Sequence, residues 1–238
     1  MIWQTSRLGI FATIVVVTAT TAFVDDAGET ADPSSRWMVV CFGDSITKRG
    51  YPSILGQMLD VETTNAGVAG NTSGEGLRRM QADVLSKNPD AVVVFFGTND
   101  LRVDATKHVP PQQYEKNLEA IIDACRKQDA EVVLCTLPPI REEAFFKRHP
   151  RELYDAAGGL PVLVSAYQQA AIRVVAKHDV TLVDLQQILR GEPSWMSADG
   201  VHPSAEGNAI IAKHIARVIA PLIGRNPVDL TVSSANGS

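Results

Sequence analysis

Residues 91–100 have the sequence AVVVFFGTND, in which six consecutive apolar residues lead into a glycine and three polar residues. A strand with one face in water alternates apolar and polar side chains, but this segment is apolar at every position from 91 to 96. Both faces of the strand must therefore be covered. This pattern is typical of a strand inside a parallel sheet that has helices packed on both sides.

Four further short apolar segments predict buried strands, at 37–42, 61–66, 131–136 and 180–185. Apolar residues at helical spacing lie between and after these segments. The predicted helical stripes are Leu77, Met80, Val84 and Leu85; Tyr114, Leu118, Ile121, Ile122 and Cys125; Leu163, Ala166, Tyr167, Ala170 and Val174; and Ile211, Ile215, Val218 and Leu222. Strands that alternate with helices of this length predict an α/β fold with a doubly wound sheet.

The composition is that of a globular protein. Of the 238 residues, 45% are hydrophobic, a fraction that supports a packed core. One domain of this length is ordinary, and we expect it to span 36–223. The 22 basic and 27 acidic residues give a net charge of −5, which argues against a nucleic-acid partner.

The N-terminal segment 1–24 differs from the rest of the chain. Arg7 is its only charged residue, an apolar segment covers 8–17, and small residues follow up to Ala22. This order predicts a signal peptide cleaved after Ala22, and so a secreted or periplasmic protein. The alternative is an uncleaved N-terminal anchor, because the uncharged stretch 8–24 just reaches the roughly 17 residues that a membrane span needs. Contact with a membrane is expected only through this segment. At the other end, we expect the tail 224–238 to be disordered.

Three cysteines are too few for a disulfide framework and do not have the spacing of metal ligands. Cys41 and Cys135 lie in predicted strands, and Cys125 lies on the apolar stripe of a predicted helix. We expect three buried free thiols, with a Cys125–Cys135 bridge as the alternative. No metal or cofactor is predicted.

Four short blocks follow predicted strands or precede the last helix. They are Gly-Asp-Ser at 43–45, Gly-Val-Ala-Gly-Asn at 67–71, Gly-Thr-Asn-Asp at 97–100 and Asp-Gly-Val-His-Pro at 199–203. Each block alone is also explained by ordinary structure: a helix cap, a tight turn, an Asx turn or a loop histidine. Together they place serine, glycine, asparagine and histidine at one edge of a doubly wound sheet, where ligands bind in such folds.

The residue types in these blocks suit acyl transfer. A serine at a strand-to-helix turn is exposed beside helix N-terminal amides. A histidine base needs a partner that fixes its tautomer, and Asp199 lies three residues before His202. The amide of Asn99 can donate to a developing oxyanion.

With these four blocks in this order, the chain resembles the SGNH hydrolases, also called the GDSL family. The resemblance implies a flavodoxin-like three-layer α/β/α sandwich with a mainly five-stranded parallel sheet. It also implies that Ser45 is the nucleophile, His202 the general base and Asp199 the residue that orients it. The oxyanion hole would consist of the backbone N–H groups of Ser45 and Gly70 and the side-chain amide of Asn99. For Asp100 we expect a turn-stabilising role.

The function expected from this resemblance is an exported serine esterase that cleaves carboxylic esters through an acyl-enzyme. Two substrate classes remain open: small acyl esters, including O-acetyl groups on carbohydrates, and the acyl lipids or thioesters of thioesterases and lysophospholipases. A binding module that keeps the fold without catalysis is the alternative from a different class.

The segment 138–161 is long for a connection and contains Pro138-Pro139, Phe145-Phe146 and Gly158-Gly159. It follows a predicted strand, so one interpretation is a flap that faces the substrate, with Phe145 and Phe146 lining an apolar groove. The other interpretation is a solvated excursion with a short helix.

Overall fold

The computed structural model describes residues 37–226, and the account below concerns these residues. The predicted signal peptide or anchor at 1–24, and residues 227–238 of the predicted tail, lie outside the described part. Within residues 37–226, no helix is both long enough and apolar enough to cross a bilayer.

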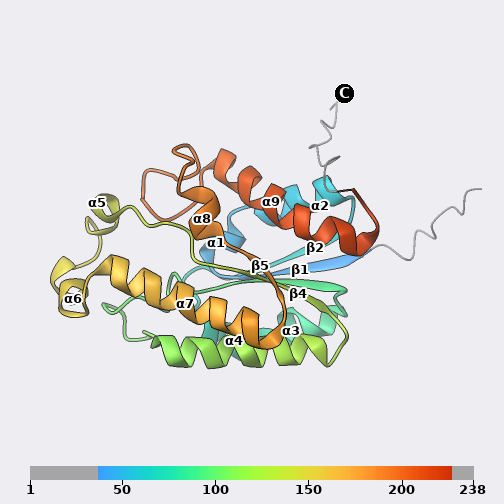
Figure 1. Ribbon diagram of the computed structural model, residues 1–238, viewed down its shortest axis with the longest axis horizontal. Helices are drawn as coiled ribbons and strands as arrows, with labels where there is room; N and C mark the ends of the chain where they lie inside the picture. The colour runs from blue at the N-terminus through green and yellow to red at the C-terminus, as the bar shows by residue number, and fades with distance from the viewer. Residues whose placement is uncertain (1–36, 227–238) are drawn as a thin grey trace, which may run out of the picture. The chain divides into compact units, whose positions relative to one another are not determined.

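A parallel sheet of five strands forms the centre of the fold (Figure 1). The strands are β1 (Met38–Gly43), β2 (Glu62–Gly67), β3 (Ala91–Phe95), β4 (Glu131–Cys135) and β5 (Thr181–Val183), in the order β2-β1-β3-β4-β5. The predicted strands are confirmed to within one residue at each start. Strand β3 lies in the middle, and all of its residues are buried, as its apolar sequence predicts.

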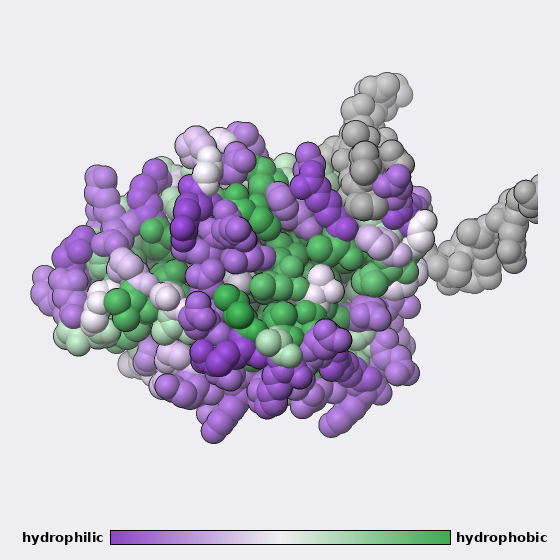
Figure 2. Space-filling view, viewed as in Figure 1, coloured by the Kyte–Doolittle hydropathy of each residue, from purple (hydrophilic) through white to green (hydrophobic). Residues whose placement is uncertain are grey.

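The prediction that all five strands are buried is wrong at both edges of the sheet. In β2 only Ala66 is buried, and in β5 only Val183 is buried. An edge strand has a neighbour on one side only, and β2 also carries a polar sequence, Glu-Thr-Thr-Asn, over most of its length. Figure 2 shows apolar surface between α7 (Leu160–His178) and α9 (Ala205–Ile219), on the side where β5 lies in Figure 1.

The helices form two layers on opposite faces of the sheet. The remaining α-helices are α1 (Ser45–Lys48), α2 (Tyr51–Leu59), α3 (Ser73–Asp83), α4 (Pro111–Arg126), α5 (Glu142–Phe145), α6 (Arg151–Ala156) and α8 (Leu185–Leu189), and the short 3₁₀ turns are η2 (Leu85–Lys87) and η3 (Ala220–Ile223). Alternate residues of one strand enter different cores: Val92 and Val94 pack with α3, α4 and α7, whereas Val93 and Phe95 pack with α2, α8 and α9. The three-layer α/β/α fold is thereby confirmed.

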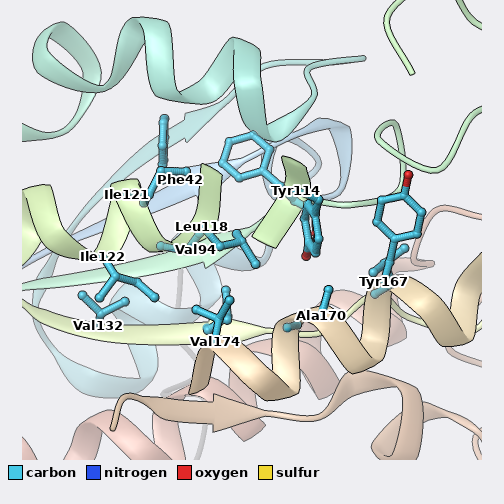
Figure 3. Close-up of a cluster of buried hydrophobic side chains, with 14 of the residues drawn as sticks. Phe42, Val94, Tyr114, Leu118, Ile121, Ile122, Val132, Tyr167, Ala170 and Val174 are labelled. Carbon is cyan, nitrogen blue, oxygen red and sulfur yellow. The ribbon is translucent and has the colours of Figure 1, made fainter. Parts of the chain in front are cut away.

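Figure 3 shows one of these cores, in which Val94 and Phe42 of the sheet meet Leu118 and Ile121 of α4 and Val174 of α7. The predicted stripe of α4 is buried at each of its five positions. For the last predicted stripe, at 211–222, the prediction is wrong at Leu222. Leu222 is 39% exposed, because α9 ends at Ile219 and the chain continues as the 3₁₀ turn η3, which breaks the helical spacing.

The cysteines confirm the expectation of buried free thiols. Cys125 belongs to the core on the α4 side of the sheet, whereas Cys41 and Cys135 belong to the core on the α9 side. The sheet itself therefore separates Cys125 from Cys135, which explains why the alternative bridge is not formed. Burial raises the pKa of Cys41 and of Cys125 to about 12, so both thiols stay protonated at neutral pH.

Candidate active site

Ser45 is the first residue of α1, directly beyond the carboxyl end of β1. Asp44 is the N-cap of this helix, and its Oδ1 accepts a hydrogen bond of 2.8 Å from the N–H of Ile46. Gly43 is needed at the turn, because a Cβ there would lie 2.1 Å from Thr47 Oγ1. Since Asp44 provides the cap, the hydroxyl of Ser45 is left to interact elsewhere.

Ser45 and His202 are in contact, although they lie 157 positions apart in the chain. The distance between Ser45 Oγ and His202 Nε2 is 2.8 Å, and that between His202 Nδ1 and Asp199 Oδ2 is 2.6 Å. In the tautomer protonated at Nδ1, the imidazole donates to Asp199 and accepts from the serine hydroxyl. Hydroxyl, imidazole and carboxylate thus form one continuous chain of hydrogen bonds.

Asp199 is held by its own turn. Its Oδ1 accepts from the backbone N–H of Val201 at 3.0 Å, from that of His202 at 2.9 Å and from the hydroxyl of Ser197 at 2.9 Å. Partial burial opposes ionisation, but these bonds and the bond from the His202 ring more than offset it and lower the pKa of Asp199 below its usual range. The carboxylate is therefore charged at neutral pH and fixed toward the ring.

Asn99 lies in the loop after β3, and its side chain joins two of the other blocks. Its Nδ2 donates to Asp44 Oδ2 at 3.1 Å and to the carbonyl of Asn71 at 3.1 Å. Gly97 begins this loop with φ of +128°, and a Cβ there would lie 2.7 Å from Leu137 Cδ1. The amide of Asn99 is therefore strictly oriented, and both of its N–H groups already have an acceptor in the unliganded protein.

Gly70 lies in the turn between β2 and α3, next to Asn71, with φ of +77°. Its carbonyl accepts a hydrogen bond from Lys107 Nζ, which also contacts Glu75 Oε2 at 3.1 Å. Among the described residues, the N–H of Gly70 has no acceptor. This turn is thus held through its carbonyl, while its N–H remains available for a ligand.

Sequence reasoning did not identify Arg79 as part of this region. From α3 its guanidinium donates to the carbonyl oxygens of Gly43 and Ala66 and to Asn71 Oδ1, and all three distances are 2.8 Å. It therefore ties the carboxyl ends of β1 and β2 to the turn that contains Gly70. The polar side of an amphipathic helix gives no local signal for such a role, since most arginines there are solvated.

Two buried carboxyl groups lie behind the Ser45–His202 pair. Burial raises the pKa of Asp44 to about 7, and the nearby charge of Asp100 contributes in the same direction. Burial likewise raises the pKa of Asp100 to about 6, although its bonds to Ser73 oppose the shift. Asp100 does more than stabilise its own turn, because it accepts from the backbone N–H and the hydroxyl of Ser73 and so fixes the start of α3.

A cavity of about 220 Å³ opens beside Ser45 and His202. Its opposite wall comes from the segment 138–161, through Phe145, Arg148 and His149. The rings of Phe145 and His149 are stacked, with centroids 4.1 Å apart. The structure thus favours the interpretation of this segment as a substrate-facing wall. Of the two phenylalanines, only Phe145 lines the cavity.

Asp104 holds this wall in place and was not anticipated from the sequence. Its carboxylate accepts from the Arg102 guanidinium at 3.0 and 3.3 Å, from His149 Nδ1 at 2.9 Å and from the Tyr154 hydroxyl at 2.5 Å. Burial opposes ionisation, but the bonds from Arg102, Tyr154 and His149 lower the pKa of Asp104. A charged carboxylate therefore joins the loop after β3 to α6 and to the wall.

Two arginines of the same segment contact the turn that carries Asp199. Arg148 Nη2 donates to the carbonyl of Asp199 at 2.7 Å, and Arg141 Nη2 donates to the carbonyl of Ser197 at 2.9 Å. The backbone N–H of Arg141 also donates to the carbonyl of Gly200 at 2.9 Å. The wall is therefore bonded both to the loop after β3 and to the turn before α9.

A hydroxyl, an imidazole and a carboxylate in contact at the carboxyl edge of a parallel sheet in a three-layer α/β/α fold form an arrangement that suits acyl transfer. Comparison with known families agrees with this chemistry: the family model of the GDSL-like lipase/acylhydrolases matches residues 41–210. The chain belongs to this family, and it is a carboxylic ester hydrolase. The resemblance seen in the sequence is confirmed.

Curated relatives include three bacterial proteins. The arylesterase of Vibrio mimicus is 27% identical over 201 residues, covering 79% of this chain and 90% of the relative. The thioesterase 1/protease 1/lysophospholipase L1 of Escherichia coli K12 is 27% identical over 198 residues, covering 79% and 86%. The uncharacterized lipoprotein YqeF of Bacillus subtilis is 30% identical over 168 residues, covering 61% and 69%.

Two solved structures are similar at the level of the whole domain. The lipase/acylhydrolase from Enterococcus faecalis superposes with a TM-score of 0.65 at 27% identity, covering 84% of this chain and 100% of the other. The acetyl xylan esterase AlAXEase superposes with a TM-score of 0.64 at 27% identity, covering 76% and 99%. The fold is therefore shared over nearly the full length of the two solved proteins and over 76–84% of this chain.

Proposed function

We propose that this protein is a serine esterase in which Ser45 is the nucleophile, His202 the general base and Asp199 the residue that orients the imidazole. The observation that carries the proposal is the unbroken chain of hydrogen bonds, 2.8 Å from Ser45 Oγ to His202 Nε2 and 2.6 Å from His202 Nδ1 to Asp199 Oδ2. A serine hydroxyl is a weak nucleophile until an adjacent base accepts its proton.

In the first half of the reaction, Ser45 Oγ attacks the ester carbonyl carbon while its proton passes to His202 Nε2. The negative charge of Asp199 stabilises the imidazolium that results. The tetrahedral intermediate then collapses: the bond to the alcohol oxygen breaks, and His202 returns the proton to that oxygen. Water next attacks the acyl-enzyme by the same route, releasing the acid and restoring the serine.

The oxyanion would be bound by the N–H groups of Ser45 and Gly70 and by the side-chain amide of Asn99. Two features support this assignment: the N–H of Gly70 is unoccupied among the described residues, and Ser45 begins α1, where helix amides point outward. Asn99 would share an N–H that now contacts Asp44 or Asn71. Donors fixed before the reaction avoid the cost of reorientation when charge develops.

A short acyl group fits the cavity best. The cavity has a volume of about 220 Å³, which is below the roughly 300 Å³ at which pockets for drug-sized ligands begin. The name of one similar solved structure, an acetyl xylan esterase, agrees with a small acyl group. A long-chain thioester or lysophospholipid would need an apolar groove beyond Phe145. A binding module without catalysis would have no need for the complete hydroxyl–imidazole–carboxylate chain.

We further propose that the protein acts outside the cytoplasm. Support comes from the sequence of 1–24, which lies outside the described residues, and from the similarity to a protein named as a lipoprotein. Secretion or residence in the periplasm would follow cleavage after Ala22. Retention at a membrane would follow if the segment is not cleaved.

The deciding experiment measures hydrolysis of p-nitrophenyl acetate by the wild type and by Ser45→Ala, both shown to be folded by circular dichroism. Loss of nearly all activity in the variant is expected, because the members of a triad act as a unit. Equal rates for the two proteins would refute the proposal. The same assay with octanoate and palmitate esters separates a short-acyl esterase, which strongly prefers acetate, from a long-chain acyl hydrolase.

A further inference from the structure

The charged side chains that line the cavity beside Ser45 are all positive. These side chains are Arg102 and Arg148, and no aspartate or glutamate lines the cavity. This local excess of positive charge contrasts with the net charge of −5 of the whole chain. A surface of this kind favours anions in a protein that otherwise repels them.

The two arginines are not equivalent. The guanidinium of Arg102 forms an ion pair with Asp104, 3.0 Å between Nη2 and Oδ2, so its charge is largely compensated. Arg148 forms no ion pair with a carboxylate in the part of the chain that the structure describes. Its recorded bond goes to a neutral acceptor, the carbonyl of Asp199, and uses one of the five N–H groups of the guanidinium.

That bond also fixes where the charge lies. Because Arg148 Nη2 is 2.7 Å from the carbonyl of Asp199, the guanidinium is held beside the turn that carries His202. A second cation, Arg49, lies near the same turn: its Nη1 is 3.9 Å from Asp199 Oδ2, and half of its side chain is exposed. Asp199 is occupied by His202, Val201 and Ser197, so it is poorly placed to neutralise both cations.

From this arrangement we infer that the rim of the cavity at Arg148 is a subsite for an anionic group, a carboxylate or a phosphate, on the substrate ester. The inference rests on the proposed esterase function and names the class of ester that this site prefers. Arginine suits the task, because its planar fork matches carboxylate and phosphate oxygens with two parallel hydrogen bonds. Phe145 lines the same wall, where its ring is stacked on His149 and makes that part of the cavity apolar.

The test compares 4-acetoxybenzoate and its meta isomer with the matching neutral acetoxybenzamides, which have the same acetyl group and nearly the same size. Each kcat/KM is divided by the rate of hydroxide hydrolysis, so that chemical reactivity cancels. Acetoxyphenyl phosphate is a second anionic substrate, and it distinguishes a preference for phosphate from a preference for carboxylate. The wild type is expected to favour the anionic esters, less so as sodium chloride is added.

Arg148→Gln should reduce this preference by about 3- to 10-fold, the range expected for one charged hydrogen bond at a partly exposed site. Arg148→Lys should keep part of it, because the charge remains. The matched control is Lys147→Gln, which removes the same charge one position away, from a side chain that is 71% exposed and absent from the cavity lining. This variant should keep the preference within about twofold.

An equal loss of activity on charged and neutral esters in Arg148→Gln would overturn the inference, since it would mean that Arg148 only supports the turn of Asp199. If Arg148→Gln does not fold, the inference is tested by Arg148→Lys and by the salt dependence of the wild type. A preference of the wild type for anionic esters that does not change with salt would overturn the inference. Failure of the esterase proposal is recognised separately, because the wild type would then hydrolyse neither ester faster than Ser45→Ala.

Discussion

The cavity has two walls that are built in different ways. One wall consists of strand-end blocks: Ser45 follows β1, Asn99 follows β3 and His202 precedes α9. The other wall is the excursion between β4 and α7, which contributes Phe145, Arg148 and His149. Ser45 and Asn99 are placed by the ends of sheet strands and His202 by the turn before α9, whereas the second wall is placed by side-chain bonds to Asp104 and to the turn of Asp199.

This difference suggests that the first wall determines the rate of the reaction and the second wall determines which substrate binds. Groups that must meet within hydrogen-bond distance lie on the rigid carboxyl edge of a parallel sheet, where small shifts are costly. The excursion is held mainly by side-chain bonds. Residues such as Phe145, which do not bond to the turn of Asp199, can therefore change without moving the Ser45–His202 pair. We therefore expect substitutions in the first wall to alter turnover and those in the second to alter which ester is accepted.

Among the variants that keep both Ser45 and His202, the largest effect is expected from Asp199→Asn. An asparagine amide can present an N–H to the ring in place of an acceptor, which stabilises the wrong tautomer of His202. A loss of roughly 10⁴-fold in kcat is expected, with a normal fold by circular dichroism. A loss of less than about tenfold would show that the orientation of the imidazole depends on other groups.

Asn99→Ala should come next, with kcat lowered by roughly 10²–10³-fold because one oxyanion donor is removed. The same change leaves Asp44 Oδ2 and the carbonyl of Asn71 without this donor, so about 1–3 kcal/mol of stability should be lost as well. Asn117→Ala is the matched control: its buried amide donates to Ser73 Oγ at 2.9 Å, and its loss should lower stability while kcat is kept. Equal kcat values for the two variants would remove Asn99 from the oxyanion hole.

In the second wall, Phe145→Ala should change the substrate rather than the turnover. Removal of the ring enlarges the cavity, so the ratio of octanoate to acetate hydrolysis should rise by about tenfold while acetate turnover stays within about threefold. Phe145 is only 1% exposed, and the cavity should cost about 3–5 kcal/mol of stability. Phe146→Ala, in a half-buried neighbour outside the cavity lining, should leave the ratio unchanged.

The last prediction concerns activity least and stability most: it is the pH dependence that comes from the buried carboxyl group of Asp44 behind the first wall. The pKa of Asp44 is raised to about 7 in the folded protein, against about 3.9 in an unfolded chain. Between these two values the folded state holds more protons, so stability should fall as pH rises from about 4 to about 7, by at most about 1.4 kcal/mol per pH unit for this group. Urea unfolding across that range should show a shallower decline for Asp44→Asn; an identical slope would contradict the assignment.

The first wall could be predicted from the sequence because its signals are local. The apolar segment at 91–96 and the polar block after it define a strand and its carboxyl end, and parallel strands bring such ends together. Burial of whole strands could not be predicted in the same way. The position of β2 and β5 at the edges of the sheet depends on the order of pairing, which the segments themselves do not encode.

The place of the second wall is one of two interpretations of 138–161, but the contacts that hold it could not be predicted, because they join residues that carry no pattern. His149 reaches Asp104 across 45 positions, and Arg148 reaches Asp199 across 51. Each of these residues alone is an ordinary charged or polar side chain in a connection, and a hydrogen bond to a distant partner gives it its role. Resemblance to a family implies roles for residues of the first wall but says nothing about these pairs.

The positions of Cys41, Cys125 and Cys135 bear on how the protein can be produced and handled. Protonated thiols inside two separate cores are poor targets for peroxide or for alkylating reagents, and no cross-link has to form before the chain reaches its final state. Maturation should therefore need neither an oxidase nor an isomerase. Material refolded with or without dithiothreitol is expected to be the same.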